Sequence, residues 1–442
     1  MDRTRTHFTA GHTRLRAAVP RRWHGCGIAV RIVATVARAG NGVSDMADND
    51  SGLDAAGTLL DLKAATLDLD DVIDDPNTRI IVCCGAGGVG KTTTAAALAL
   101  RAAEHGRRVC VLTIDPARRL AQAMGLTELD NTPRPVVGVD GDGSLHAMML
   151  DMKRTFDEVV ESHSDPERAQ AILDNPFYQA LSSSFAGTQE YMAMEKLGQL
   201  RAEADADGTW DLIVVDTPPS RSALDFLDAP ERLGTFLDGR FIRVLTAPAR
   251  GAGRGIGRLL GAGFGLFAGV LTKILGAQLL ADLGAFVAAV DTMFGGFRER
   301  AELTYALLAD PGTAFVVVAA PERDALREAS YFVERLEDDK MPLAGLVLNR
   351  VMSVRAPDLS AEEATVAAAH LTEAGENPET AALLSLHADR MRTRTSQQRL
   401  AVRFTAAHPL VPAAQVPALP EDVHDLEGLR TVGTLLAHAH NP

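Results

Sequence analysis

Short apolar runs alternate with longer amphipathic stretches along most of the chain. The runs lack the regular change between polar and apolar residues of half-exposed strands, so we expect strands that are buried on both faces. Strands that alternate with helices predict an α/β fold with a doubly wound, mostly parallel sheet. The predicted strands cover residues 79–85, 108–115, 145–151, 210–217, 313–320, 343–350 and, as a final candidate, 408–416.

Two helical insertions interrupt this alternation, at about residues 152–205 and 232–310, and we expect them to form a helical subdomain. Charged residues in the second keep its uncharged stretches below the roughly 18 residues of a membrane span. Its apolar side chains recur at the spacing of one helical face, which is either the core of the subdomain or a groove for a client. The face comprises Leu260, Phe264, Phe267, Leu271, Leu275, Leu279, Leu283, Phe286, Val290 and Phe294.

The first 45 residues differ in composition from the rest, with eight arginines against two aspartates. Arg31 interrupts the one apolar stretch that resembles the core of a secretory signal. The segment is an Arg-rich presequence, a disordered extension, or translated sequence upstream of a start at Met46, and we expect no part of the fold in it. Leucine and valine at helical spacing predict an N-terminal helix within residues 46–77, ahead of a single large domain over residues 78–442.

Composition and charge exclude several classes of partner and cofactor. With 442 residues and 46% apolar content, the chain is long enough to bury a large core. Its net charge of −14 argues against nucleic acid or an anionic membrane surface as the main partner. The cysteines, Cys26, Cys83, Cys84 and Cys110, have no spacing typical of zinc or iron–sulfur sites, so we expect neither metal group and a reducing, cytoplasmic location.

The segment "GAGGVGKT" carries the clearest chemistry. Gly85, Gly90, Lys91 and Thr92 match the pattern G-x-x-x-x-G-K-[ST] between a predicted strand and a predicted helix, which indicates a phosphate-binding loop. The backbone N–H groups of such a loop point at phosphate oxygens, Lys91 neutralises the β- and γ-phosphates, and the Thr92 hydroxyl binds Mg²⁺. The predicted nucleotide-binding residues here are Gly85, Gly87, Gly88, Val89, Gly90, Lys91, Thr92 and Thr93.

Two aspartates end predicted strands on the side where parallel sheets bind ligands. Asp216 follows four apolar residues and suits a magnesium position, through a bridging water. Asp115 is placed to orient, or accept a proton from, the water that attacks the γ-phosphate. Each aspartate also has a simpler interpretation as a helix cap before proline.

Together these motifs resemble the arsenite-pump ATPase (ArsA) family of P-loop ATPases with a deviant loop, which also contains the eukaryotic tail-anchored-protein targeting factor. The resemblance extends over most of residues 78–430 and is closest to actinobacterial anion-transporting members. It rests on the loop, on "TIDPARRL" and on "VVDTPPSRSALDFL", in that order. It implies ATP and Mg²⁺ as cofactors, catalytic roles for Lys91, Asp115 and Asp216, and contacts near the adenine base from Asn349 and from residues 416–423, including Pro417.

One departure from the family affects the expected assembly. The family's loop begins G-K-G-G, and its first lysine reaches the nucleotide of a partner subunit, but Ala86 stands at that position here. The resemblance therefore predicts a heterodimer with a paralogous ATPase whose lysine enters the site of this chain. The competing interpretations are a monomer or homodimer with slow hydrolysis, and a weakly hydrolysing regulatory subunit. The further expected partners are a hydrophobic client or a membrane protein, which would bring this cytoplasmic chain to a membrane.

Overall fold

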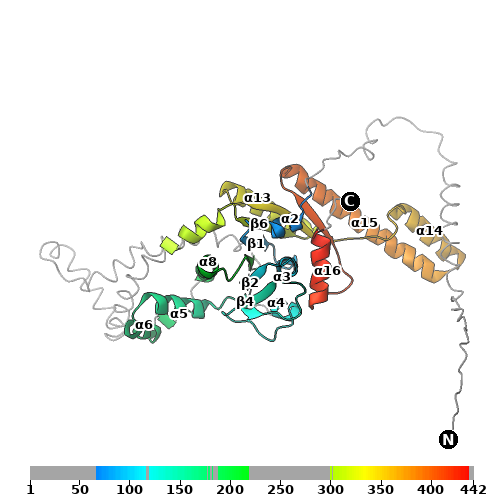
Figure 1. The fold of residues 1–442 in the computed structure, drawn as a ribbon. Helices are drawn as coiled ribbons and strands as arrows, with labels where there is room; N and C mark the ends of the chain where they lie inside the picture. Colours follow the sequence, from blue (N-terminus) through cyan, green and yellow to red (C-terminus); the bar gives the residue numbers. More distant parts are fainter. Residues whose placement is uncertain are drawn as a thin grey trace, which may run out of the picture. The chain divides into compact units, whose positions relative to one another are not determined.

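The computed structural model describes residues 66–437, apart from residues 116–118, 177, 180–181, 183–187, 219–298 and 301. An eight-stranded sheet with the order β3-β4-β2-β5-β1-β6-β7-β8 lies at its centre (Figure 1). All neighbouring strands pair in parallel except β3 and β4, which pair antiparallel at one edge. The strands are β1 (Ile80–Gly85), β2 (Arg108–Thr113), β3 (Arg134–Pro135), β4 (Ser144–Met149), β5 (Leu212–Asp216), β6 (Thr313–Ala319), β7 (Leu343–Val351) and β8 (Ala413–Pro417).

The central strands are apolar along most of their length because both of their faces are covered. In β1, Ile80, Val82 and Cys84 belong to one apolar cluster, whereas Ile81 and Cys83 belong to another on the opposite face. Successive side chains of a strand point to opposite faces, so continuous apolar runs fit a sheet between two helical layers. The predicted α/β fold with a mostly parallel sheet is confirmed.

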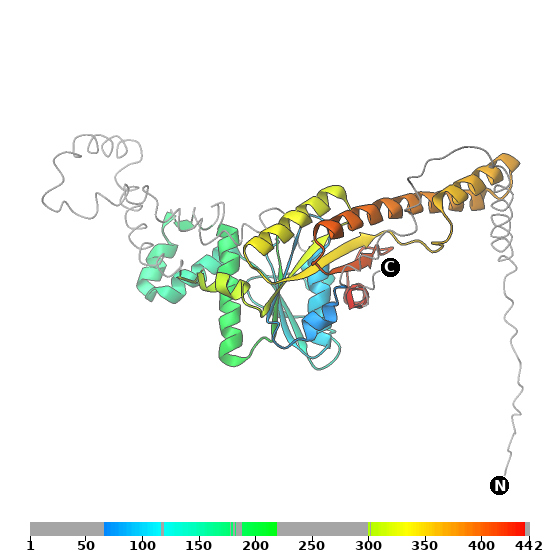
Figure 2. The ribbon, with the colours of Figure 1, turned by 90° about the horizontal axis from the view of Figure 1, so that it is seen from above.

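Helices α3 and α13 lie on opposite faces of the sheet (Figure 2). The face of α3 (Lys91–Glu104) also carries α2 (Leu69–Asp74), α4 (Arg119–Ala123) and α16 (Leu426–Ala437). The opposite face carries α5 (Met152–His163), α6 (Pro166–Leu173), α8 (Thr188–Asp207) and α13 (Arg323–Asp338). Small side chains dominate α3, from Ala95 to Ala97 and at Ala102 and Ala103, which lets the helix approach the sheet closely.

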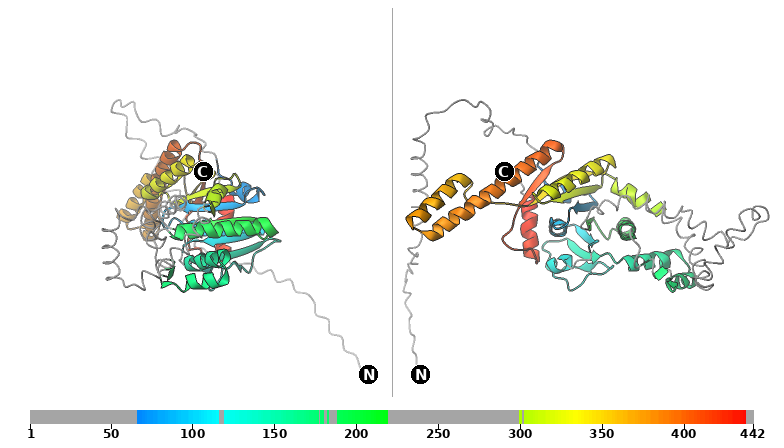
Figure 3. Two further views of the ribbon diagram at one scale, coloured as in Figure 1. Left: turned by 90° about the vertical axis from the view of Figure 1, so that its left-hand side faces the viewer. Right: turned by 180° about the vertical axis from the view of Figure 1, so that it is seen from behind.

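The first predicted insertion is helical where the structure describes it; α5 packs against α8, and α6 packs against α5 (Figure 3). Glu195 of α8, which is buried, accepts a bond of 2.9 Å from Arg300 and a bond from the Tyr191 hydroxyl. This ion pair ties α8 to the helical residues that precede β6. Most of the second predicted insertion, including its apolar face from Leu260 to Phe294, lies outside the described residues.

Residues 354–395 form a compact unit of their own within the described chain. Helix α14 (Ala361–Ala374) begins with a capping box in which Ser360 and Glu363 bond each other's backbone N–H groups. Ala361 and Ala364 pack against Ala388 of α15 (Pro378–Ala407), so this hairpin has a small, alanine-rich core.

Two local predictions differ from the structure. The last strand begins at Ala413 instead of residue 408, because α15 continues to Ala407 and prolines at 409 and 412 delay entry into the sheet. Of the N-terminal helix expected within residues 46–77, the described part holds only α2, which ends before Asp75, the residue that precedes a proline.

Candidate functional site

The loop between β1 and α3 has the geometry that its glycines predict. Gly90, the N-cap of α3, has a φ of 100°, a left-handed value, and an added Cβ would overlap the Asn349 side-chain amide. Gly85 has a φ of 147°, and a Cβ there would overlap the Val318 carbonyl of β6. Only glycine fits at both positions, so the loop closes tightly onto the N-terminus of α3.

Lys91, the first residue of α3, is only 5% exposed. Its ammonium donates a hydrogen bond of 2.8 Å to the Ala86 carbonyl, which holds the side chain back across its own loop. Burial lowers the pKa of Lys91, and the nearby Asp216 carboxylate opposes that shift. A buried cation at the start of a helix is a strong attractor for phosphate, since little water competes for it.

Asp216, the last residue of β5, is fully buried behind the loop. Its Oδ2 accepts hydrogen bonds from the hydroxyls of Thr92 at 2.8 Å and Thr113 at 2.9 Å. Burial raises the pKa of Asp216 to about 6, while the two threonine hydrogen bonds and Lys91 act in the opposite direction. Its second oxygen, Oδ1, is buried and has no hydrogen-bond partner among the described residues.

This arrangement fits the predicted magnesium ion. A buried carboxylate oxygen without a partner, next to a threonine hydroxyl, provides the oxygen donors that Mg²⁺ binds directly or through water. Thr92 and Asp216 would hold the ion, which supplies charge to neutralise the phosphates of a bound nucleotide. Among the described residues, no group of three or more His, Cys, Asp or Glu side chains is arranged to bind a metal by itself.

Asp115 lies two residues beyond the end of β2, at the carboxyl edge of the sheet. Its backbone N–H donates to the Thr113 hydroxyl at 3.2 Å, and the same hydroxyl reaches Asp216, so one threonine connects both predicted aspartates. Asp115 is half-buried and lines a cavity above the loop, whereas Asp216 does not. The structure thus places Asp115 on the ligand side and Asp216 behind Thr92; their catalytic roles stay predictions.

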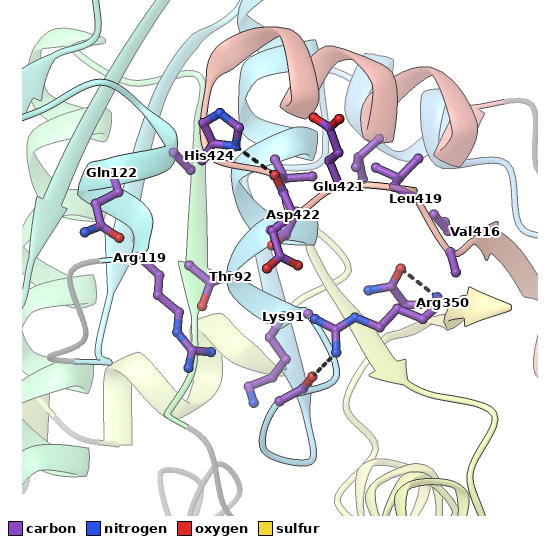
Figure 4. Close-up of a pocket in the computed structure, with 18 of the residues that line it drawn as sticks. Lys91, Thr92, Arg119, Gln122, Arg350, Val416, Leu419, Glu421, Asp422 and His424 are labelled. Carbon is purple, nitrogen blue, oxygen red and sulfur yellow. Dashed lines mark hydrogen bonds between the residues drawn. The ribbon is translucent and has the colours of Figure 1, made fainter.

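The cavity has a volume of about 770 Å³, within the range of small-molecule sites (Figure 4). Of the predicted residues, Gly88, Gly90, Lys91, Thr92, Thr93, Asp115, Asn349 and Pro417 line it. Gly85, Gly87 and Val89 belong to the same loop but do not line the cavity.

Asn349 joins one wall of the cavity to the loop. Its amide nitrogen donates to the Val89 carbonyl at 2.8 Å, and its oxygen accepts from the Arg350 N–H at 2.9 Å. Both functional groups of the amide are therefore held by the protein, and one N–H of the amide remains for a ligand. Residues 416–423, which resemble the family's segment near the base, form the adjoining wall, with Leu419, Glu421 and Asp422.

Sequence reasoning missed several residues of the cavity. Arg119, Gln122, Arg350 and His424 line it, and Thr113 supports it from behind. Thr113 had a readable signal, because it lies two positions before Asp115 and shares its side of the strand. Arg119 and Arg350 follow predicted site residues closely, but the direction of their side chains depends on tertiary packing.

The parallel sheet, the loop at its carboxyl edge and the Lys91–Thr92–Asp216 cluster define a P-loop nucleotide-binding protein. A family model described as "Anion-transporting ATPase" matches residues 78–371, two thirds of the chain. The chain belongs to the anion-transporting ATPase family, and it is therefore a P-loop ATPase with an α/β fold.

Individual relatives agree with this assignment. A protein named ATPase GET3 from Malassezia globosa is 32% identical over 165 residues, which cover 37% of this chain and 46% of that protein. ATPase ARSA2 from Chlamydomonas reinhardtii is 28% identical over 64% of this chain and 71% of its own length. An "Arsenical pump-driving ATPase" from Acidiphilium multivorum is 30% identical, and the match covers 35% of this chain and 26% of that protein.

The raised pKa of Asp216 leads to a stability prediction. In the folded protein this pKa is about 6, above the value of about 4 expected in the unfolded chain. The folded state then binds the proton more tightly, so stability is fully present below pH 4 and declines as the pH rises through 6. Asp216→Asn removes this titration and should stabilise the ligand-free protein at pH 8 by on the order of 2–3 kcal/mol.

Urea unfolding of the wild type and of Asp216→Asn between pH 4 and 8, without nucleotide or Mg²⁺, tests this expectation. The advantage of the variant should shrink steadily below pH 6. A constant difference across the range would show that Asp216 is not destabilised by burial. Asp338→Asn, an exposed substitution on α13, is the control for a general effect of removing one carboxylate.

Proposed function

We propose that the chain is a Mg²⁺-dependent ATPase whose nucleotide cycle moves its helical segments, and that these segments bind a client or a partner subunit. The observation that carries the proposal is the Thr92–Asp216 hydrogen bond at the end of β5. Thr217 follows directly, and its hydroxyl donates to the Cys83 carbonyl of β1 at 2.9 Å. The predicted second helical insertion, at about residues 232–310, follows about fifteen residues later in the chain.

This continuity gives the nucleotide a direct route to the insertion. Magnesium binding would change the partners of Thr92 and Asp216, and the backbone that leads from β5 toward the insertion begins at Asp216. At the other end of the insertion, Arg300 is paired with the buried Glu195 of α8. The chain that leads to the insertion thus starts at the site, and Arg300, near the end of the insertion, is anchored to the helical layer.

The chemistry of the site supports hydrolysis. The oxygen of a water would form a bond to the γ-phosphorus while the bond from this phosphorus to the β–γ bridging oxygen breaks, giving ADP and inorganic phosphate. Asp115, on the cavity wall, would orient the water and accept its proton. Retention of Lys91, Thr92, Asp115 and Asp216 supports an ATPase over a regulatory subunit that only binds nucleotide.

A relative whose name describes it as pump-driving supports a membrane protein as one class of partner. A soft metalloid as cargo receives no support from Cys83, Cys84 and Cys110, since all three thiols are buried and burial raises their pKa. In the part of the chain that the structure describes, no helix has the length and hydropathy of a membrane span. The heterodimer with a paralogous ATPase and the cytoplasmic location stay predictions.

Hydrogen–deuterium exchange tests the coupling. We expect exchange within residues 219–298 to change when MgATP or a non-hydrolysable analogue replaces MgADP, because the γ-phosphate alters the partners of Thr92 and Asp216. Lys91→Ala is the matched control and should show no change at the same nucleotide concentrations. Nucleotide-dependent exchange confined to the loop and α3 would contradict the coupling while leaving ATP binding intact.

A further inference from the structure

The loop lacks its second cation, because an alanine stands at the position where the family has a lysine. Ala86 is 8% exposed and belongs to the apolar cluster on the α3 face of the sheet. Its carbonyl already accepts the Lys91 ammonium. Lys91 is therefore the only cation that the loop itself offers to a phosphate, and the developing charge on a transferred phosphoryl group normally meets more than one.

Arg119 brings a second cation to the same cavity from the same chain. It is the first residue of α4, four residues after Asp115, and it lines the cavity with Lys91, Thr92 and Asp115. Figure 4 shows its guanidinium on the side of the cavity where the Lys91 ammonium and the Thr92 hydroxyl lie. A residue so close to Asp115 in the chain would move with it during the cycle.

The guanidinium of Arg119 has no ion-pair or hydrogen-bond partner among the described residues, although it lies in an acidic protein. Arg134, a partly exposed arginine, is paired with Asp130, whereas Arg119 is exposed. Most exposed arginines are simply solvated, and what separates Arg119 from them is its position on the wall of a phosphate-binding cavity. Beside the buried ammonium of Lys91, it makes this wall attractive for an anion.

Arg350 is less suited to this role. Its guanidinium donates to the Gly88 carbonyl at 3.1 Å, and it follows Asn349, which holds the Val89 carbonyl. The Arg350 guanidinium, although it also lines the cavity, is thus already bound to the loop backbone.

We propose that Arg119 is a catalytic residue that contacts the γ-phosphate during hydrolysis and supplies, within one chain, the charge that Ala86 lacks. The planar fork of a guanidinium matches two phosphoryl oxygens at once, which a point charge does not. The inference rests on the proposed ATPase function, and it removes the need for a partner's lysine in the chemical step. A partner subunit would then bind the client or a membrane protein, and the hydrolysis site is complete without it.

The test uses the full chain purified alone, with Arg119→Ala, Arg119→Lys and the surface control Arg327→Ala on α13. We expect Arg119→Ala to lower the single-turnover rate of ATP hydrolysis by about 10³- to 10⁵-fold, while the Kd for MgATP stays within about tenfold. Arg119→Lys should recover only part of the rate. Trapping of MgADP with aluminium fluoride, which imitates the transferring phosphoryl group, should be lost in Arg119→Ala even though ADP still binds.

The outcomes separate this inference from the function on which it rests. Wild-type hydrolysis and trapping in Arg119→Ala would overturn the inference. So would a wild-type chain that is inactive alone and is activated by a paralogue's loop lysine regardless of Arg119, because the charge would then come from the partner. Failure of the wild type to bind MgATP would instead overturn the proposed function. Thermal unfolding of each variant identifies any loss of activity caused by misfolding, and Arg119→Gln replaces an alanine variant that does not fold.

Discussion

Lys91→Ala should abolish ATP binding at concentrations that saturate the wild type. Lys91 is the buried cation of the phosphate loop, and its only described partner is the Ala86 carbonyl. A bound phosphate can replace this carbonyl as the acceptor of the Lys91 ammonium. Removing one member of a buried charge pair costs about 2–5 kcal/mol, or about 30- to 5,000-fold in Kd. Isothermal titration calorimetry with MgATP measures this change directly.

A matched control makes the result specific. Lys153→Ala removes an exposed lysine from α5, where it pairs with Asp157, and should leave the Kd unchanged. If Lys91→Ala bound MgATP as tightly as the wild type, the loop would not be the phosphate site and the assignment of the cavity would be wrong. The variant should remain folded, because the deleted ammonium makes one hydrogen bond, to a carbonyl of its own loop.

Asp115→Asn should separate binding from chemistry. The side chain lines the cavity but lies outside the loop that cradles the phosphates, so MgATP should bind within about threefold of the wild-type Kd. Turnover should fall by about 10²- to 10⁴-fold, the range for loss of a positioned general base. Rapid-quench single-turnover assays at saturating ATP give the rate of the chemical step.

The competing interpretation of Asp115 as a structural cap makes a different prediction. In that case the variant would lose binding, turnover and thermal stability together. Asp338→Asn, an exposed change on α13, provides the baseline for all three measurements. Unaltered turnover in Asp115→Asn would exclude both roles and would direct the search for the base to other residues of the cavity.

The sheet was predictable because burial on both faces leaves little choice of residue. β6 is apolar from Ala314 to Ala319, and neither a surface strand nor a surface helix tolerates such a run. The last strand was placed five residues early because "HPLVP" is apolar without pairing in the sheet. Hydropathy reports burial, whereas strand ends depend on where a neighbouring strand offers hydrogen bonds.

The site was predictable only as far as local backbone geometry determines it. The loop conformation requires glycine at Gly85 and Gly90, so the sequence of the loop predicts its conformation. The position of Asp216 at the carboxyl edge of the sheet could be predicted because it ends a buried strand. Arg119 could not, since whether it faces solvent or the cavity depends on how α4 packs against the sheet, which no short pattern encodes.

If Asn349 contacts the base, as the family resemblance implies, this one side chain links the base end and the phosphate end of a bound nucleotide. Its amide is fastened to the Val89 carbonyl, one residue before Gly90 and two before Lys91. A base that accepts a hydrogen bond from the remaining N–H therefore binds the same side chain that holds the loop around the triphosphate. Discrimination between nucleobases should then appear in the speed of bond cleavage as well as in occupancy. A base that fits poorly would leave the triphosphate bound but misaligned for hydrolysis. The coupling would therefore limit the hydrolysis of nucleotides whose base does not fit the site.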